Sequence, residues 1–231
     1  MKDKLHFRWI ETPLGISILS WQEEKLVSFV LPCKEKEQAF ARFAQKCQPL
    51  FASFKEERND PFFLEAPIQS YFQGQKTALS TYPFFLEIYP PFTQKVLIAT
   101  ASIPHGSTRT YGEIARTVGV PQAPRAVGQS LGRNLLLLFI PCHRVVAQNS
   151  LGGFGEGLRM KVLLLSIEFS NLVSGSLYQG TLQESTDPLI DQEGDSSIHR
   201  SPLQEIERNN CGKEHFQHHF PWRPKVNGSN H

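Results

Sequence analysis

Apolar and polar positions alternate over the first third of the chain in the manner of β-strands. The alternation covers residues 9–19 and is interrupted by a turn at Pro13 and Gly15, which predicts a hairpin. A second apolar stretch over residues 25–31 predicts a third strand beside it. We therefore expect a small sheet in this part of the molecule.

Helical spacing replaces this alternation further along the chain. The pattern predicts an amphipathic surface helix over residues 34–48 and a shorter helix over residues 66–72. A short strand is expected over residues 84–88, inside a proline-rich passage at 83–91 that is our candidate domain boundary. A helix over residues 93–102 then opens the second region.

Two short helices with a tight connection come next. Thr110 and Glu113 have the spacing of a capping box, so a helix should begin there and end at Gly119. Pro124 suits the first turn of a second helix, and Gly132 suits its end. This arrangement is typical of a helix-turn-helix, although an ordinary helical hairpin in a core has the same pattern.

Apolar periodicity is lost after Phe169. Residues 171–231 are rich in Ser, Gln, Asn, Gly and acidic residues, and they hold five of the eight histidines. This composition predicts a disordered tail, and the alternative is a His-rich segment that binds metal.

Composition places the chain among soluble proteins with one large domain or two small ones. Of its 231 residues, 40% are hydrophobic and 11% aromatic, which is enough to bury a core. Four cysteines are too few for a disulfide scaffold. The longest apolar run, at 135–140, is far short of the ~18 residues of a membrane span. No apolar stretch follows the first four residues, so we expect no secretory signal and a cytoplasmic location.

Charge is unevenly distributed, although the formal net charge is only +2. Residues 1–89 carry equal numbers of basic and acidic side chains, whereas residues 90–170 carry eight basic and three acidic ones. Residues 171–231 carry an acidic excess. The middle segment therefore suits a polyanion, with a solvated basic face as the alternative.

One cysteine lies in a setting that favours reactivity. A buried run stops at Pro141, and Cys142 is followed at once by His143 and Arg144. The thiolate is the nucleophilic form of cysteine, and basic or cationic neighbours favour it, so we expect His143 and Arg144 to activate Cys142. A buried structural cysteine is the alternative. A zinc site is disfavoured, because the four cysteines form no CxxC pair.

These residues carry a resemblance to a known family. Pro-Cys-His-Arg-Val at 141–145 is similar to the active-site signature of the 6-O-alkylguanine-DNA alkyltransferases, also called methylated-DNA–protein-cysteine methyltransferases. The resemblance extends from Phe92 to about Glu168, roughly a third of the chain. The other matching segments are Thr-Tyr-Gly-Glu-Ile-Ala at 110–115, Arg-Ala-Val-Gly at 125–128, Asn134, and Gly-Phe-Gly-Glu-Gly-Leu at 153–158.

The resemblance implies an α/β (α+β) fold in three parts. It implies a small N-terminal sheet-and-helix domain at 1–89 and a mostly helical domain with a DNA-binding helix-turn-helix at 90–170. The tail at 171–231 has no counterpart in the family pattern. The implied activity is DNA repair, in which a methyl or larger alkyl group moves irreversibly from the 6-oxygen of guanine to a cysteine of the protein, once per molecule.

The resemblance also implies roles for individual residues. Cys142 would be the alkyl acceptor, His143 its general base, in the family through a bound water, and Glu168 the group that orients His143. Tyr111 would contact the flipped guanine and help neutralise it, and Arg125 would fill the gap that the guanine leaves. The remaining substrate- and DNA-binding residues implied are Asn134, which braces the turn that carries the active-site strand, Val145, Phe154 and Lys161.

The partner implied is double-stranded DNA that contains alkylated guanine. The 6-oxygen belongs to a stacked base, so the nucleotide must be turned out of the duplex before the sulfur reaches it. The resemblance implies that the second helix of the pair enters the minor groove with little sequence preference. It also implies a monomer that needs no cofactor or metal and no membrane.

Two departures from the family pattern and three alternatives stay open. Gly155 stands where many members have Ser, and a carboxylate at Glu156, beside the pocket, could narrow it or repel a phosphate. The alternatives are a non-enzymatic protein that binds alkylated DNA, an alkylation-sensing regulator and, more distantly, a Cys–His hydrolase. If Glu168 is partly exposed, Glu168→Ala should affect folding mildly and the chemistry more strongly.

Overall fold

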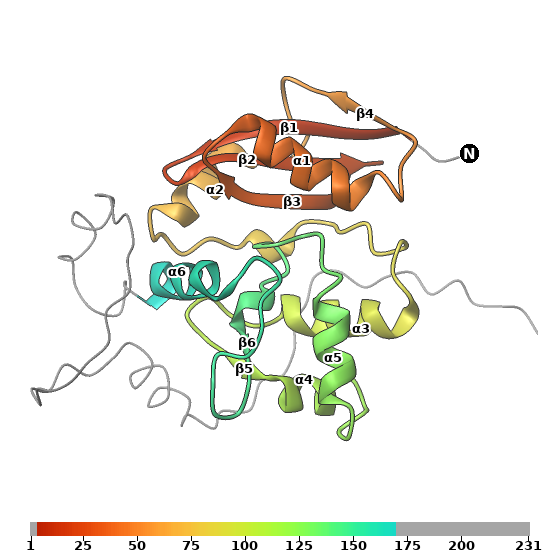
Figure 1. Cartoon of the computed structure of the whole chain (residues 1–231), viewed down its shortest axis with the longest axis vertical. Coiled ribbons are helices and arrows are strands. Elements are labelled where there is room, and N and C mark those ends of the chain that lie inside the picture. The colour runs from red at the N-terminus through yellow and green to blue at the C-terminus, as the bar shows by residue number, and fades with distance from the viewer. Residues whose placement is uncertain (1–3, 170–231) are drawn as a thin grey trace, which may run out of the picture.

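The computed structural model of the chain describes residues 4–169 and has an α+β fold, as predicted (Figure 1). One half is a sheet with two helices, and the other half is mostly helical. The strands are β1 (Lys4–Thr12), β2 (Gly15–Gln22), β3 (Lys25–Cys33), β4 (Ser53–Glu56), β5 (Arg109–Thr110) and β6 (Val145–Val146). The helices are α1 (Lys36–Cys47), α2 (Glu65–Phe72), α3 (Pro91–Ala101), α4 (Tyr111–Thr117), α5 (Pro124–Leu131) and α6 (Leu158–Phe169), with 3-10 turns η1 (Leu79–Thr81) and η2 (Cys142–Arg144).

The larger sheet has the strand order β3–β2–β1–β4. The predicted hairpin is confirmed, with Thr12 opposite Gly15 across a two-residue turn. Gly15 has a φ of +123°, and a Cβ there would lie 2.3 Å from the carbonyl oxygen of Cys33, so the turn requires glycine. The third strand is also confirmed, whereas β4 is not predicted by the sequence pattern, because its four residues are mostly exposed and do not alternate.

The two faces of this sheet are covered differently. α1 packs on one face, where the rings of Phe7 and Phe43 lie 5.2 Å apart. The other face packs on α2 and on the helical half, and there the ring of Phe29 lies 5.5 Å from that of Phe139. One apolar core therefore continues from the sheet into the helical half, and the division at residue 89 stays a prediction.

The predicted strand over residues 84–88 is absent. Phe84 forms only a single parallel bridge with Leu26, supported by a hydrogen bond of 2.8 Å from Leu26 N to the carbonyl oxygen of Pro83. Pairing stops after one bridge because the chain turns at once: Leu86 N donates to the carbonyl oxygen of Phe84 at 3.1 Å, and Tyr89 N donates to that of Leu86 at 3.0 Å.

The segment that leads to Cys142 is also not a strand. Residues 136–140 are buried but follow a series of turns, in which Leu138 has a φ of +76°. A single parallel bridge joins Leu136 to Phe29 of the sheet. The expectation of an active-site strand is therefore wrong, and a compact buried loop carries the cysteine.

The predicted helix pair is present as α4 and α5, which pack against each other and against α3. The capping box is complete, since Thr110 Oγ1 accepts from Glu113 N at 3.1 Å and Glu113 Oε2 accepts from Thr110 N at 2.7 Å. Gly119 comes next with a φ of +83°, as expected at the end of a helix.

Three further expectations concern the tail, membrane spans and metal sites. The predicted disordered tail at 171–231, with its histidines, lies outside the described residues. Over residues 4–169, the structure contains no helix of sufficient length and apolarity to cross a membrane. Within the same range, no three His, Cys, Asp or Glu side chains converge on a position for a metal ion.

Candidate active site

Cys142 is the first residue of η2 and is only 7% exposed to solvent. Asn134 Nδ2 donates to the sulfur at 3.2 Å and to the carbonyl oxygen of Ile140 at 2.9 Å. The same amide accepts from Leu136 N at 3.0 Å through Oδ1. Asn134 therefore braces the buried loop before Cys142 and contacts the sulfur itself.

The resting protonation state of Cys142 is a consequence of this burial. Desolvation raises the pKa of the thiol, and the hydrogen bond from Asn134 and the positive charge of Lys161 oppose that rise. The prediction that Arg144 activates the sulfur is wrong, because its guanidinium binds Glu168 and the carbonyl oxygen of Ile103. The sulfur is thus a neutral thiol at rest and must lose its proton during reaction.

His143 and Glu168 form a buried pair beside the cysteine. His143 Nε2 lies 2.7 Å from Glu168 Oε1, and both side chains are fully enclosed. Although burial alone raises it, the pKa of Glu168 is held well below its usual range by the hydrogen bond to His143 and by the positive charge and hydrogen bonds of Arg144. Glu168 therefore remains a carboxylate, and the proton between the two groups lies on His143 Nε2.

The other nitrogen of His143 is the one available to accept a proton. Burial lowers the pKa of His143, although Glu168 opposes this, so the ring is neutral at neutral pH. With the hydrogen on Nε2, the lone pair lies on Nδ1, which has no hydrogen-bond partner within residues 4–169. The geometry therefore provides a neutral base, oriented by a carboxylate, next in the chain to the thiol.

Glu168 is far more enclosed than the sequence alone predicts. It is 2% exposed and accepts from donors on three other segments. Those donors are Tyr71 of α2 at 2.6 Å, Gly106 N at 3.3 Å, Arg144 Nε and Nη2 at 2.8 and 2.9 Å, and His143. The condition of partial exposure is not met, so the expectation of a mild effect of Glu168→Ala on folding does not apply.

Lys161 shapes the loop between β6 and α6. Its buried ammonium donates to the carbonyl oxygens of Val145 at 2.6 Å, Leu151 at 2.5 Å and Gly153 at 3.2 Å. Tyr111 OH donates to the same Gly153 oxygen at 3.2 Å, and burial raises the pKa of Tyr111. Lys161 and Tyr111 thus donate to the same carbonyl oxygen of the loop.

Glu156, the carboxylate that we expected beside the pocket, has partners of opposite charge in the structure. Its carboxylate, 10% exposed, pairs with Arg42 at 3.1 Å and with Lys46, both from α1. Its charge is therefore neutralised by the sheet half rather than left to repel a phosphate. A Cβ at neighbouring Gly155 would meet no atom within 4 Å.

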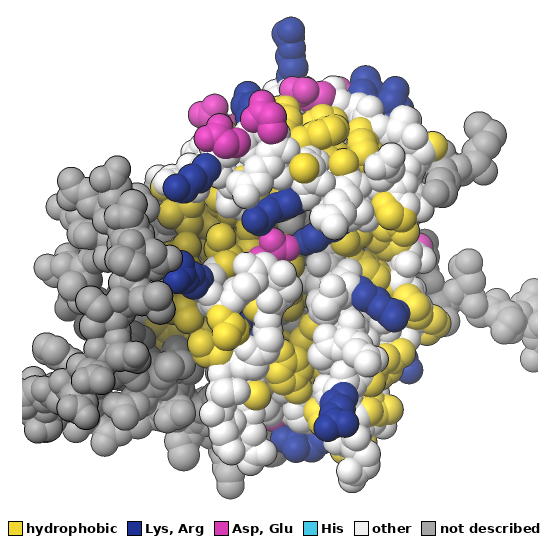
Figure 2. Space-filling model, viewed as in Figure 1, with side chains coloured by type: hydrophobic (Ala, Val, Ile, Leu, Met, Phe, Trp, Pro, Cys, Tyr) yellow, Lys and Arg dark blue, Asp and Glu magenta, His cyan; other side chains and the backbone are white. Residues whose placement is uncertain are grey.

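The other predicted residues fall in three different settings. Arg125 is exposed in the first turn of α5. Phe154 places its ring edge-on to His143, with centroids 6.5 Å apart. The Val145 side chain is fully buried, so Val145 offers its backbone to this site. On the face seen in Figure 2, the charged side chains of the half that holds α3–α5 are mostly Lys and Arg, whereas the sheet half shows Lys and Arg together with most of the acidic side chains.

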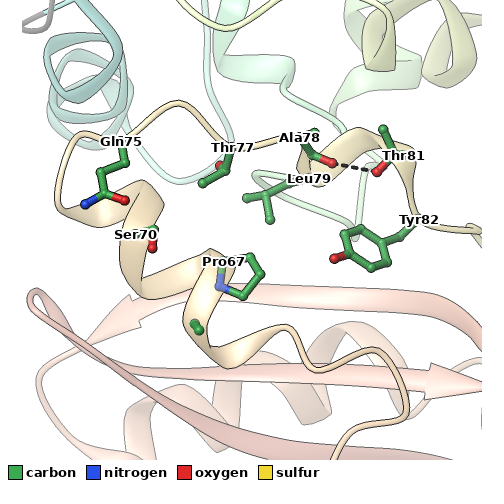
Figure 3. Close-up of a pocket in the computed structure, with 9 residues that line it drawn as sticks. Pro67, Ser70, Gln75, Thr77, Ala78, Leu79, Thr81 and Tyr82 are labelled. Carbon is green, nitrogen blue, oxygen red and sulfur yellow. Dashed lines mark hydrogen bonds between the residues drawn. The ribbon is translucent and has the colours of Figure 1, made fainter.

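A surface cavity of about 460 Å³ lies away from this chemistry, between α2 and residues 75–82 (Figure 3). Pro67 and Ser70 of α2 face Thr77 and Leu79 across it, and Thr81 Oγ1 donates to the Ala78 carbonyl oxygen at 2.8 Å. No Cys, His, Lys, Arg, Asp or Glu lines it. This cavity therefore offers no thiol, imidazole or charged group, and Cys142 remains the candidate.

Tyr71 is the residue of this site that the sequence pattern does not single out. It lies in a short helix predicted from apolar spacing, and nothing local distinguishes it from a core tyrosine. Only the contact with Glu168, 97 positions away in the chain, reveals its place.

Comparison with known proteins adds sequence relatives. A model of the family described as "6-O-methylguanine DNA methyltransferase, DNA binding domain" matches residues 91–170. The constitutive methylated-DNA–protein-cysteine methyltransferase of Bacillus subtilis is 36% identical over 167 residues, which cover 71% of this chain and 94% of that protein. The methylated-DNA–protein-cysteine methyltransferase of Methanosarcina acetivorans is 33% identical over 172 residues, which cover 72% and 99%.

Solved structures of proteins with related names are also similar to this chain. The O6-methylguanine methyltransferase of Mycobacterium tuberculosis is similar with a TM-score of 0.56 at 29% identity, covering 72% of this chain and 93% of that one. A structure of OGT from the same organism in complex with DNA gives a TM-score of 0.54 at 30% identity, covering 71% and 93%.

Proposed function

Since the chain belongs to the family of methylated-DNA–protein-cysteine methyltransferases, we propose that it repairs DNA by moving the methyl or alkyl group of 6-O-alkylguanine to its own Cys142. The observation that carries the assignment to Cys142 is its setting. A buried thiol contacts Asn134 and is followed by a neutral histidine whose other nitrogen is fixed by Glu168. This is the nucleophile, base and orienting group of a covalent catalyst.

The reaction balances without a cofactor. The sulfur forms a bond to the alkyl carbon while the bond from that carbon to the guanine oxygen breaks, and the electron pair stays on the guanine. The proton lost by the thiol moves through a water to His143 Nδ1, which later releases it to solvent, and the guanine takes up one proton from solvent, so the number of protons is unchanged overall. The thioether product is not reversed by proton transfer, so each molecule acts once.

Tyr111 suits the leaving side of this reaction. Because burial raises its pKa, the phenol keeps its proton and donates a hydrogen bond. In the complex, we propose that it donates to the guanine as negative charge develops there. Phe154 and the loop held by Lys161 form the wall beside the alkyl group.

DNA engagement is assigned to α4 and α5. We propose that α5 enters the minor groove, that the alkylated nucleotide is turned out toward Cys142, and that exposed Arg125 fills the vacancy. Contacts with phosphates and the insertion of a side chain into the base stack depend little on sequence, which suits a repair protein. We further propose that a monomer acts, in the reducing cytoplasm, where an acceptor thiol survives.

The test is a single-turnover transfer assay with the full chain and a duplex containing 6-O-methylguanine. Mass spectrometry should find one added methyl group on the peptide that holds Cys142, and Cys142→Ser should abolish it. Cys33→Ser and Cys47→Ala are matched controls, because both residues are buried free cysteines away from His143, and both should retain transfer. Binding without transfer would support the non-enzymatic alternative, and a methyl group on another cysteine would overturn the assignment.

A further inference from the structure

Tyr71 reaches the His143–Glu168 pair from the sheet half of the molecule. Its hydroxyl donates to Glu168 Oε1 at 2.6 Å and lies 3.4 Å from His143 Nε2. The residue is 1% exposed, on α2, which lies beneath the sheet next to α6 (Figure 1). A group outside the helical half therefore touches the carboxylate that orients the base.

The position of this hydroxyl affects the proton affinity of His143. Glu168 Oε1 accepts from three donors, namely His143 Nε2, Tyr71 OH and Arg144 Nη2. Each donor draws on the negative charge of that oxygen, and a less negative oxygen stabilises protonated His143 less. The Tyr71 hydrogen bond thus acts in the same direction as burial and favours the neutral ring.

We propose that Tyr71 is a positioning residue for the transfer reaction, whose hydroxyl holds Glu168 and thereby keeps His143 unprotonated and ready to take the thiol proton. This inference rests on the proposed function of Cys142. It gives the sheet half a direct part in the chemistry, since α2 supplies the group.

Other charged or titratable groups also face His143 and must be separated from Tyr71 in any titration. They are His105 from the loop after α3, Cys142 and Arg144 of η2, and Lys161 and Glu168 of α6. His105 is the one that could be confused with His143, because its ring lies 6.0 Å from that of Tyr71 and burial lowers its pKa too.

The test compares the pH dependence of methyl transfer for the wild type and Tyr71→Phe, which keeps the ring and removes the hydroxyl. Without this donor, His143 should hold its proton to higher pH, so the acidic limb of the rate profile should move up by about one unit. The rate below the limb should fall about tenfold, and the rate above it should change little. Nitrogen-15 NMR of the histidine rings should show the same shift for His143, with His105→Gln used to assign His105.

Tyr89→Phe is the matched control. Tyr89 is also buried, and its hydroxyl accepts from Leu135 N at 3.0 Å without touching Glu168, so this variant should leave the limb in place. An unmoved limb in Tyr71→Phe, or a rate reduced by one factor at every pH, overturns the proposal. If Tyr71→Phe does not fold, 3-fluorotyrosine at position 71, a stronger donor, should move the limb the other way. If the wild type transfers no methyl group, the proposed function fails, while the NMR shift still decides the role of Tyr71.

Discussion

Single residues in this protein act through contacts that are distant in sequence. Glu168 shows this best, because its carboxylate collects hydrogen bonds from α2, from the loop after α3 and from η2. Removing it leaves the buried guanidinium of Arg144 without its counterion, and such unpaired buried charges are strongly destabilising.

We therefore expect Glu168→Ala to lower the free energy of unfolding by about 3–5 kcal/mol at neutral pH. The folded pKa of Glu168 lies below its ordinary value of 4.5, so its contribution is complete above that value and is lost as pH falls further, toward the folded pKa. Urea unfolding at several pH values should show the two proteins converging in acid.

Glu87→Ala serves as the control, because Glu87 is an exposed partner of Lys25 and should change stability little. Transfer rates should separate the two roles of Glu168: a loss of rate in the protein that remains folded reports the orientation of His143. Equal stability of wild type and Glu168→Ala at neutral pH would contradict the structure.

At the scale of elements, a connection between the halves runs through charge as well as apolar packing. The loop before α6 carries Glu156, and α1 supplies Arg42 and Lys46 to it. These cations are partly exposed, so each pair contributes modestly and is screened by salt. The pairs nevertheless fix the loop whose Gly153 carbonyl binds Lys161 and Tyr111.

A double-mutant cycle of Glu156→Gln and Arg42→Met should give a coupling of about 0.5–1 kcal/mol that shrinks at high salt. Urea denaturation of the four proteins measures it. The same cycle on the more exposed pair Lys25–Glu87 should give a smaller coupling free energy. Absent coupling at low salt would mean that Arg42 has no part in joining Glu156 to α1, and the same cycle with Lys46→Met would then test the second pair.

On the scale of the whole molecule, the half that holds α3–α6 carries the excess of positive charge (Figure 2). Such a surface attracts a polyanion over the distance of the Debye length, about 10 Å at moderate salt. Binding that releases counterions from DNA weakens steeply as salt rises.

We expect the affinity for duplex DNA to fall with a linear slope of log affinity against log salt. Arg125→Ala should weaken binding several-fold, since its exposed cation lies on α5, the helix proposed to face DNA. Arg58→Ala, a substitution in the sheet half, should bind as the wild type does. Fluorescence anisotropy with an unmodified duplex measures both, and equal effects of the two substitutions would place the DNA elsewhere.

Local signals were enough to predict most of the elements and the reactive cysteine. The Gly15 turn, the Thr110–Glu113 capping box and the proline start of α5 depend on residues within a few positions of one another, so one stretch of chain determines them. The adjacency of Cys142 and His143 is likewise local.

Tertiary structure alone decided how that cysteine is controlled. The protonation of Cys142 depends on its burial. The partner of Arg144 is Glu168, near the end of α6, and Tyr71 contacts the same carboxylate from 97 positions earlier in the chain. The partners of Glu156 come from a helix more than a hundred residues earlier. Hydrogen bonds and desolvation depend on which groups meet in space, and the periodicity of a single segment holds no record of its distant neighbours.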